Sequence, residues 1–234
     1  MTLPAIDKHQ LLSTHFLFRD LTPEEIERIA KIGGNKKLAA NETLFLKGDP
    51  GSALYGVLSG RVRISSSSPD GKEVIISILE PGGVFGEIAL LDGMPRTADA
   101  SALEPVELFM IHRREFLEFL KGHPTLTTHL LKMVCSYVRS SNEFVEDFIF
   151  LGLSKRLAKR LLSLRLFYGE HLTETEPKEL KISQVELGQI MGTSREAINR
   201  QLQEWRKEGW IKLGKGRINI LDPEALRELV EEED

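Results

Sequence analysis

The residues Gly86, Glu87 and Arg96 have the types and the spacing of a binding site for a small anion. Gly86 lets a ligand approach the backbone closely, and residues 87–91 can form one helical turn whose first N–H groups are free. Such N–H groups, together with a nearby guanidinium, can hold one phosphate. A glutamate in an anion site needs a second partner, and a sugar hydroxyl would satisfy it. The pattern therefore favours a nucleotide as the ligand.

This stretch resembles the phosphate-binding cassette of the cyclic-nucleotide-binding domains, as found in the bacterial catabolite activator (cAMP receptor protein) family. The family pattern is Gly-Glu-apolar-Ala/Gly-Leu, a short gap, and then Arg-Ser/Thr/Ala-Ala. The positions that fit it are Gly86, Glu87, Ile88, Ala89, Leu90, Arg96, Thr97 and Ala98. The alternative is a glycine-rich turn beside an unrelated surface arginine. The resemblance implies that six of these residues bind the nucleotide, namely Gly86, Glu87, Ile88, Ala89, Arg96 and Thr97.

The composition excludes several classes of protein. The chain has 234 residues, of which 41% are hydrophobic, and its apolar runs fall short of the roughly 18 residues of a membrane helix. The single cysteine, Cys135, excludes an internal disulfide and a four-thiolate cluster. The six histidines lack a two-ligand helical spacing, so we expect no metal. Because the first residues contain no basic-then-apolar signal, we expect a cytoplasmic protein without a membrane partner.

The formal net charge of −4 conceals a basic segment. Residues 154–221 contain 14 basic and 8 acidic side chains, which gives +6. Residues 222–234 contain 7 acids and one arginine, which gives −6, and residues 1–153 contain 16 basic and 20 acidic side chains, which gives −4. The distribution of charge is therefore compatible with a nucleic-acid-binding segment in the C-terminal third.

The elements that must position the cassette indicate an α+β fold. Residues 1–35 read as a helical lead-in, with Thr22 as an N-cap and Pro23 as the first helical residue. From Lys36 to Ile111, short alternating runs are separated by glycine-containing turns, which is typical of a sandwich or barrel. Further matches to the glycine positions of the cyclic-nucleotide β-roll are Gly48, Gly51 and Gly60.

One strand of this predicted roll offers candidate contacts for the base. A base pocket is mostly apolar with few polar groups, and Ile76 and Leu79 flank Ser77 on such a strand. The alternative is that Ile76 and Leu79 belong to the ordinary core.

A long helix is predicted from Thr125 to about Phe150. A row of mostly apolar positions on this helix alternates by four and three, a spacing typical of a two-stranded coiled coil. These positions, called the seam below, are Thr127, Leu131, Val134, Val138, Ser141, Val145 and Phe148. We therefore expect a homodimer; a single helix packed on its own roll is the alternative.

Ser141 and Asn142 are polar residues at and beside this seam. In the family these two positions hold hydroxyls that touch the adenine amino group, from the same and from the partner subunit. The resemblance therefore implies that Ser141 and Asn142 also bind the ligand, although Asn142 departs from the family's hydroxyl. A polar seam residue that fixes the helix register is the alternative reading of Ser141.

We expect three parts along the chain. Residues 1–124 form the cyclic-nucleotide-binding β-roll domain, residues 125–152 the dimerisation helix and hinge, and residues 153–234 a winged helix-turn-helix domain with an acidic tail. Gly152 gives the hinge its backbone freedom. Ser154 is predicted to cap a helix that runs to Tyr168.

The residues 182–202 read as a helix, a tight turn and a second helix. Ser183 and Glu186 can form a capping box at the start of the first helix, and Gly192 ends it. Either Thr193 or Ser194 can cap the second helix. Residues predicted to point inward are Leu187, Ile190, Met191, Ile198, Leu202 and Trp205.

The outward face of the second helix carries side chains that can read base edges. Arg195 and Arg200 can each fork onto guanine, and Glu196 can accept from a cytosine amino group; a capping box with Thr193 is the alternative for Glu196. The arrangement Arg-Glu-x-x-x-Arg resembles the family's recognition helix, which reads TGTGA-like half-sites. In the hairpin wing that follows, Lys215 and Arg217 are predicted phosphate contacts. The candidate DNA-binding residues are Ser183, Gln184, Ser194, Arg195, Glu196, Asn199, Arg200 and Lys215.

Together the two motifs predict a homodimeric bacterial transcription regulator of this family, which is gated by a cyclic nucleotide and is not an enzyme. The resemblance implies cAMP as effector, and Thr97 favours cGMP as an additional one, because threonine there is associated with cGMP in the superfamily. Expected partners are double-stranded DNA, a second copy of the chain and RNA polymerase. The alternative is a family member that binds DNA without a cyclic-nucleotide effector. A further alternative is a winged helix that binds only protein.

Overall fold

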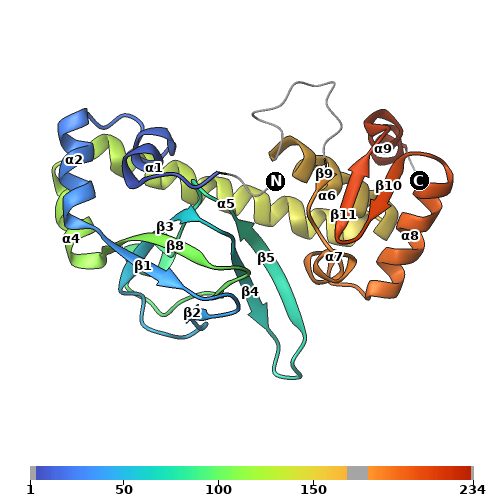
Figure 1. Ribbon diagram of the computed structural model, residues 1–234, viewed down its shortest axis with the longest axis horizontal. Helices are drawn as coiled ribbons and strands as arrows, with labels where there is room; N and C mark the ends of the chain where they lie inside the picture. The colour runs from blue at the N-terminus through green and yellow to red at the C-terminus, as the bar shows by residue number, and fades with distance from the viewer. Residues whose placement is uncertain (1–3, 168–178, 233–234) are drawn as a thin grey trace. The chain divides into compact units, whose positions relative to one another are not determined.

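The computed structural model describes residues 4–167 and 179–232 (Figure 1). The chain divides into two compact units, Met1–Val138 and Arg139–Asp234. The boundary falls inside one continuous helix, α5 (Pro124–Phe150). Among the described residues, no helix is both long enough and apolar enough to cross a membrane. A separate dimerisation part at residues 125–152 stays a prediction.

Two four-stranded antiparallel sheets form the centre of the first unit. One sheet has the order β1-β8-β3-β6 and the other the order β2-β7-β4-β5. The strands are β1 (Gly34–Leu38), β2 (Thr43–Phe45), β3 (Ala53–Ser59), β4 (Val62–Ser67), β5 (Glu73–Leu79), β6 (Val84–Phe85), β7 (Asp99–Ala102) and β8 (Val106–His112). Between the sheets lie buried side chains such as Val57, Val62 and Leu108. The β-roll predicted from the sequence is confirmed.

Helices of the first unit pack together at one end of the roll (Figure 1), and a further short helix carries the start of the cassette. They are α1 (Lys8–Thr14), α2 (Pro23–Ile32), α4 (Arg113–Lys121), the first turns of α5, and the short α3 (Glu87–Asp92). The N-cap Thr22 and the N1 residue Pro23 start α2 as predicted, and Glu25 completes a capping box. A shared core of residues from α1, α2, α4 and α5 includes Leu11, Ile29, Phe116, Leu126 and Leu130.

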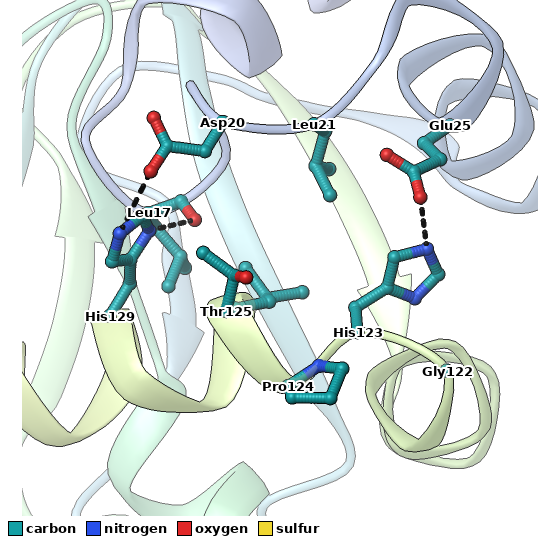
Figure 2. Close-up of a pocket in the computed structure, with 10 residues that line it drawn as sticks. Leu17, Asp20, Leu21, Glu25, Gly122, His123, Pro124, Thr125 and His129 are labelled. Carbon is teal, nitrogen blue, oxygen red and sulfur yellow. Dashed lines mark hydrogen bonds and ion pairs between the residues drawn. The ribbon is translucent and has the colours of Figure 1, made fainter.

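Two buried histidines tie the N-terminal helices to the start of α5 (Figure 2). His123 Nε2 lies 3.0 Å from a Glu25 carboxylate oxygen, and His129 Nε2 lies 3.2 Å from an Asp20 carboxylate oxygen. The Nδ1 atom of each ring faces a backbone carbonyl. The two histidines line a cavity of about 160 Å³, but each of their ring nitrogens already has a partner within the protein. This cluster therefore holds the lead-in on α5, and it offers little to a ligand.

The second unit contains a helix-turn-helix and a three-stranded antiparallel sheet of order β10-β11-β9. Its elements are α6 (Leu153–Phe167), β9 (Glu179–Leu180), α7 (Gln184–Met191), α8 (Arg195–Lys207), β10 (Ile211–Gly214), β11 (Arg217–Ile220) and α9 (Pro223–Glu231). As predicted, Ser183 and Glu186 form the capping box of α7, and Gly192 ends α7 in a left-handed conformation with φ 63°. All six predicted core positions of the two helices are buried.

The start of α6 corrects one prediction. The helix begins at Leu153, and the Gly152 carbonyl already accepts the Arg156 N–H at 3.1 Å. Ser154 therefore lies inside the first helical turn, and it is not the N-cap. Gly152, the predicted hinge residue, occupies the position before the helix. The predicted end of this helix, Tyr168, lies outside the described residues.

Candidate functional site

The cassette begins where β6 ends. Phe85 is paired with Tyr55 of β3, and Gly86 then turns the chain with φ 86° and ψ 8°. Side chains rarely adopt this left-handed conformation, and a Cβ on Gly86 would lie 2.7 Å from an Arg96 guanidinium nitrogen. Glu87 follows as the first residue of α3. Gly86 is therefore required both for the turn and for the close approach of Arg96.

Arg96 reaches back from the loop after α3 to the start of that helix. Its side chain donates to the Gly86 carbonyl and to the Ala53 carbonyl, each at 2.8 Å. Its backbone is held as well, because its N–H donates to the Asp49 carbonyl at 2.8 Å and its carbonyl accepts the Gly48 N–H at 2.9 Å. The structure thus brings the two halves of the predicted motif together.

Aromatic rings support the Arg96 guanidinium. The guanidinium carbon lies 4.2 Å from the centre of the Phe45 ring and 5.6 Å from that of Tyr55, within the range of a cation–π interaction. Tyr55 in turn stacks on Phe85, with ring centres 5.4 Å apart. The sequence alone does not indicate Phe45 and Tyr55, because their approach to Arg96 depends on the pairing of strands far apart in the chain.

Glu87 and Arg96 are buried but keep open hydrogen-bonding positions. Glu87 is 5% exposed and Arg96 is 4% exposed, and neither Glu87 Oε2 nor Arg96 Nε has a hydrogen-bond partner. Burial raises the pKa of the Glu87 carboxyl, although its backbone N–H, Tyr137 and Arg96 act in the opposite direction. Burial also lowers the pKa of Arg96. A buried acceptor and a buried donor without partners mark a site that is suited to a polar ligand.

The other predicted ligand residues lie in different surroundings. Ala89 is buried, whereas Ile88 and Thr97 are exposed beside the cassette. Ser141 and Asn142 are exposed on the part of α5 that belongs to the second unit, and their contact with a ligand stays a prediction. Of the two candidate base contacts, Leu79 packs against the core of the roll and Ile76 is exposed. For Leu79, the core interpretation is therefore favoured.

Replacing Glu87 by Gln is expected to raise the Tm of the ligand-free protein. Because burial raises the pKa of this carboxyl, the folded state holds the proton more tightly than the unfolded state. The resulting stability is present at acid pH and is lost as the pH rises through the folded-state pKa. At neutral pH, Gln avoids the cost of a buried charge, so melting curves should show a gain of about 2–4 °C, the shift for 1 kcal/mol in a domain of this size.

The gain from Glu87→Gln should shrink as the melts are repeated towards pH 4. Glu118→Gln, at an exposed carboxylate on α4, is the control and should leave the Tm unchanged at every pH. A Tm for Glu87→Gln that equals or falls below that of the wild type at neutral pH would contradict this interpretation of Glu87.

The second unit presents the predicted recognition residues on the outer face of α8. Arg195, Glu196, Asn199 and Arg200 are all exposed. Ser194 is the N-cap of α8 and accepts the Ala197 N–H at 3.2 Å. Because the cap is Ser194, a capping box between Thr193 and Glu196 does not form. Glu196 is thereby available for another partner.

The β10–β11 hairpin forms the predicted wing. Lys215 is exposed in its turn, where Gly216 has φ 67°. Arg217 donates to a Glu179 carboxylate oxygen at 2.6 Å and so ties β11 to β9. Arg217 was predicted to contact phosphate, but its guanidinium pairs with the Glu179 carboxylate. Lys215 is the better candidate of the two.

Comparison with known families covers both units. Residues 35–123 match the cyclic nucleotide-binding domain family, and residues 155–229 match the Crp-like helix-turn-helix domain family. The CRP-like cAMP-activated global transcriptional regulator of Mycobacterium tuberculosis is 30% identical over 217 residues, which cover 93% of this chain and 97% of that protein. The chain belongs to the CRP/FNR family of transcription regulators. As a CRP/FNR protein it is a regulator, not an enzyme.

Other proteins that are similar to this chain carry different names. The cyclic AMP receptor protein of Thermus thermophilus is 30% identical over 213 residues, covering 91% of this chain and 95% of that protein. The global nitrogen regulator of Synechocystis is 28% identical over 188 residues, covering 80% of this chain and 84% of that protein. Among solved structures, the Thermus thermophilus catabolite activator protein has 30% identity and a TM-score of 0.54, with 92% of this chain and 97% of that chain covered.

Proposed function

We propose that this CRP/FNR protein is a homodimeric transcription regulator whose affinity for DNA is set by a cyclic nucleotide. The observation that carries the proposal is the pair of buried, unpartnered atoms Arg96 Nε and Glu87 Oε2. A cyclic nucleotide has a phosphate that can accept from the guanidinium and one free ribose hydroxyl that can donate to the carboxylate. One ligand would thus satisfy both atoms.

We infer that cAMP is the effector and that cGMP also binds. Relatives named for cAMP that are 30% identical over nearly the whole chain support the first part. The exposed hydroxyl of Thr97, next to Arg96, supports the second, because it can meet the 2-amino group of guanine. Calorimetry with each nucleotide should show heat from both. Heat from cAMP alone would remove the argument from Thr97.

The uncovered seam of α5 supports the homodimer. Leu131 is 63% exposed, Val138 is 55% exposed, and Val145 and Phe148 are similarly accessible in the single chain. An apolar stripe of this length at heptad spacing is stable in water only when a second helix covers it. We therefore propose that a second copy of α5 covers this seam.

Val138→Glu is expected to turn the dimer into a monomer, because two carboxylates would face each other in an apolar seam. Sedimentation of the wild type should give the mass of two chains, and sedimentation of the variant should give the mass of one chain. Arg139→Glu, at the next position and off the seam, is the matched control and should stay dimeric. A dimeric Val138→Glu protein would contradict the assignment of the seam.

A dimer that is gated by a nucleotide would bind DNA through both of its recognition helices. Two copies of α8 would enter successive major grooves of a TGTGA-like palindrome, roughly 34 Å apart. The nucleotide would shift the population towards the arrangement that has this spacing. RNA polymerase is the expected further partner at promoters.

The alternative is a family member that binds DNA without a cyclic nucleotide. One similar protein favours considering it, because that protein is named a global nitrogen regulator, a name that mentions no nucleotide. The presence of both Glu87 and Arg96 argues against it. Measuring DNA binding with and without cAMP separates the two functions.

A further inference from the structure

Two amide side chains are joined by a hydrogen bond on the outer face of α8. Gln203 Nε2 donates to Asn199 Oδ1 at 3.3 Å, and a spacing of four residues makes the two side chains neighbours on a helix. Asn199 is exposed and Gln203 is half-buried. The opposite side of the helix is buried at Ile198, Leu202 and Trp205. The amide pair therefore lies on the face that the proposed function directs to DNA.

The hydrogen bond from Gln203 sets the orientation of the Asn199 amide. An asparagine amide has an oxygen with two lone pairs and a nitrogen with two hydrogens. Gln203 occupies one lone pair of Oδ1 and leaves the other open. Within the described part of the chain, the Asn199 amide nitrogen has no hydrogen-bond partner. Asn199 therefore presents one acceptor and one donor side by side, in a single orientation.

An acceptor beside a donor matches the major-groove edge of one base. Adenine presents the acceptor N7 and the donor N6 amino group, and an asparagine amide can bond to both at once. Guanine presents two acceptors at this edge, cytosine a donor, and thymine an acceptor and a methyl group. Adenine is therefore the base whose edge satisfies both groups of the Asn199 amide.

We propose that Asn199 reads an adenine in each half-site and that Gln203 is the positioning residue that holds the Asn199 amide for this contact. The inference rests on the proposed function of α8 as the recognition helix, and it names a base that α8 selects. A flipped amide would place its oxygen opposite N7 and its nitrogen opposite the N6 amino group, and both pairs repel. By holding Oδ1 of Asn199, Gln203 disfavours the flipped form.

The test measures the preference for adenine at each A·T pair of the half-site. Fluorescence anisotropy gives affinities for TGTGA palindromes in which one base pair of each half-site is replaced by every other pair. In a second set, each adenine in turn is replaced by 7-deaza-adenine, which keeps the amino group and lacks the N7 acceptor. The wild type is compared with Asn199→Ala, Gln203→Ala and the double variant, with and without saturating cAMP.

Gln201→Ala is the matched control for Gln203→Ala. Gln201 is also a half-buried glutamine of α8, but its Nε2 donates at 3.1 Å to a carboxylate oxygen of Glu204. The control therefore removes a similar side-chain pair from the same helix without touching Asn199. It should keep the wild-type preference at every position of the palindrome.

Asn199→Ala should lower the preference for adenine at one position by about 5- to 150-fold, the range for a bidentate contact between a side chain and a base. Gln203→Ala should lower the same preference about 2-fold, the effect of one such side-chain pair on a helix. The double variant should lose no more than Asn199→Ala, because Gln203 acts through Asn199. At that position, 7-deaza-adenine should weaken binding of the wild type and leave binding of Asn199→Ala unchanged.

Several results would overturn the inference and leave the proposed function intact. They are an equal loss on all palindromes in Asn199→Ala, a lost preference for a base other than adenine, and an unchanged preference in Gln203→Ala. If cAMP had no effect on affinity, the proposed gating would fail, and the adenine preference would still decide the inference. A wild-type protein that binds none of the palindromes in either state would overturn both.

Discussion

Arg96→Ala is expected to lower the affinity for cAMP by a factor of about 30 to 4,000. This range corresponds to the roughly 2–5 kcal/mol that is lost when one partner of a buried, hydrogen-bonded charge pair is truncated. The guanidinium is 4% exposed and its Nε has no partner in the protein. A phosphate that loses this donor would be left in a desolvated site without a counter-charge. Calorimetry on the variant measures the loss directly.

The same substitution should also lower the Tm, because Arg96 has a structural role. It would remove the Arg96 donor from the part-buried Gly86 carbonyl and from the buried Ala53 carbonyl, and an unsatisfied buried group costs about 1–3 kcal/mol. Arg96→Lys separates the two effects. The lysine keeps the charge but cannot make a forked contact, so it should recover more stability than affinity.

Arg61→Ala is the matched control for Arg96. Arg61 is a partly buried arginine of the same unit and pairs with Glu104 at 3.2 Å, outside the cassette. This variant should bind cAMP like the wild type even if its Tm falls. Arg96 would lose its assigned role if Arg96→Ala and Arg61→Ala bound cAMP equally well.

Arg200→Ala is expected to weaken binding to a TGTGA palindrome by about 1–3 kcal/mol per contact and to relax the preference at one base pair. The side chain is exposed on the outer face of α8, where a guanidinium can fork onto guanine O6 and N7. Fluorescence anisotropy with a set of palindromes that differ at each position measures both the loss and the change of preference.

Lys215→Ala provides the contrast, because Lys215 lies in the turn of the wing. As a phosphate contact, it should weaken binding to all sequences about equally and reduce the slope of log affinity against log salt by about 1. If Arg200→Ala instead gave the same loss on every sequence, Arg200 would contact phosphate and would not read a base.

The sequence predicts those features that neighbouring residues determine. The helical turn at Glu87 and the caps of α7 and α8 each depend on a few consecutive positions. The β-roll could be predicted because short runs of strand-forming residues are separated by glycine-containing turns. The strand β6 and the strand β9 have only two residues each, too few to show a period of two.

The parts of the site that could not be predicted depend on tertiary pairing. The Arg96 guanidinium is held at the Ala53 carbonyl of β3, and Phe45 approaches it from β2 of the other sheet. No local signal in the sequence indicates this contact. The pairing of Arg217 with Glu179 likewise joins strands that are 38 positions apart in sequence.

The central claim is that a cyclic nucleotide bound at Arg96 and Glu87 controls the affinity of the dimer for DNA. The most direct test is a titration of a labelled TGTGA palindrome with the wild-type protein, without nucleotide, with cAMP and with cGMP. The account predicts a DNA affinity at least about 5-fold higher with cAMP than without nucleotide, and a loss of this difference in Arg96→Lys. Equal affinity in the presence and absence of nucleotide would contradict it.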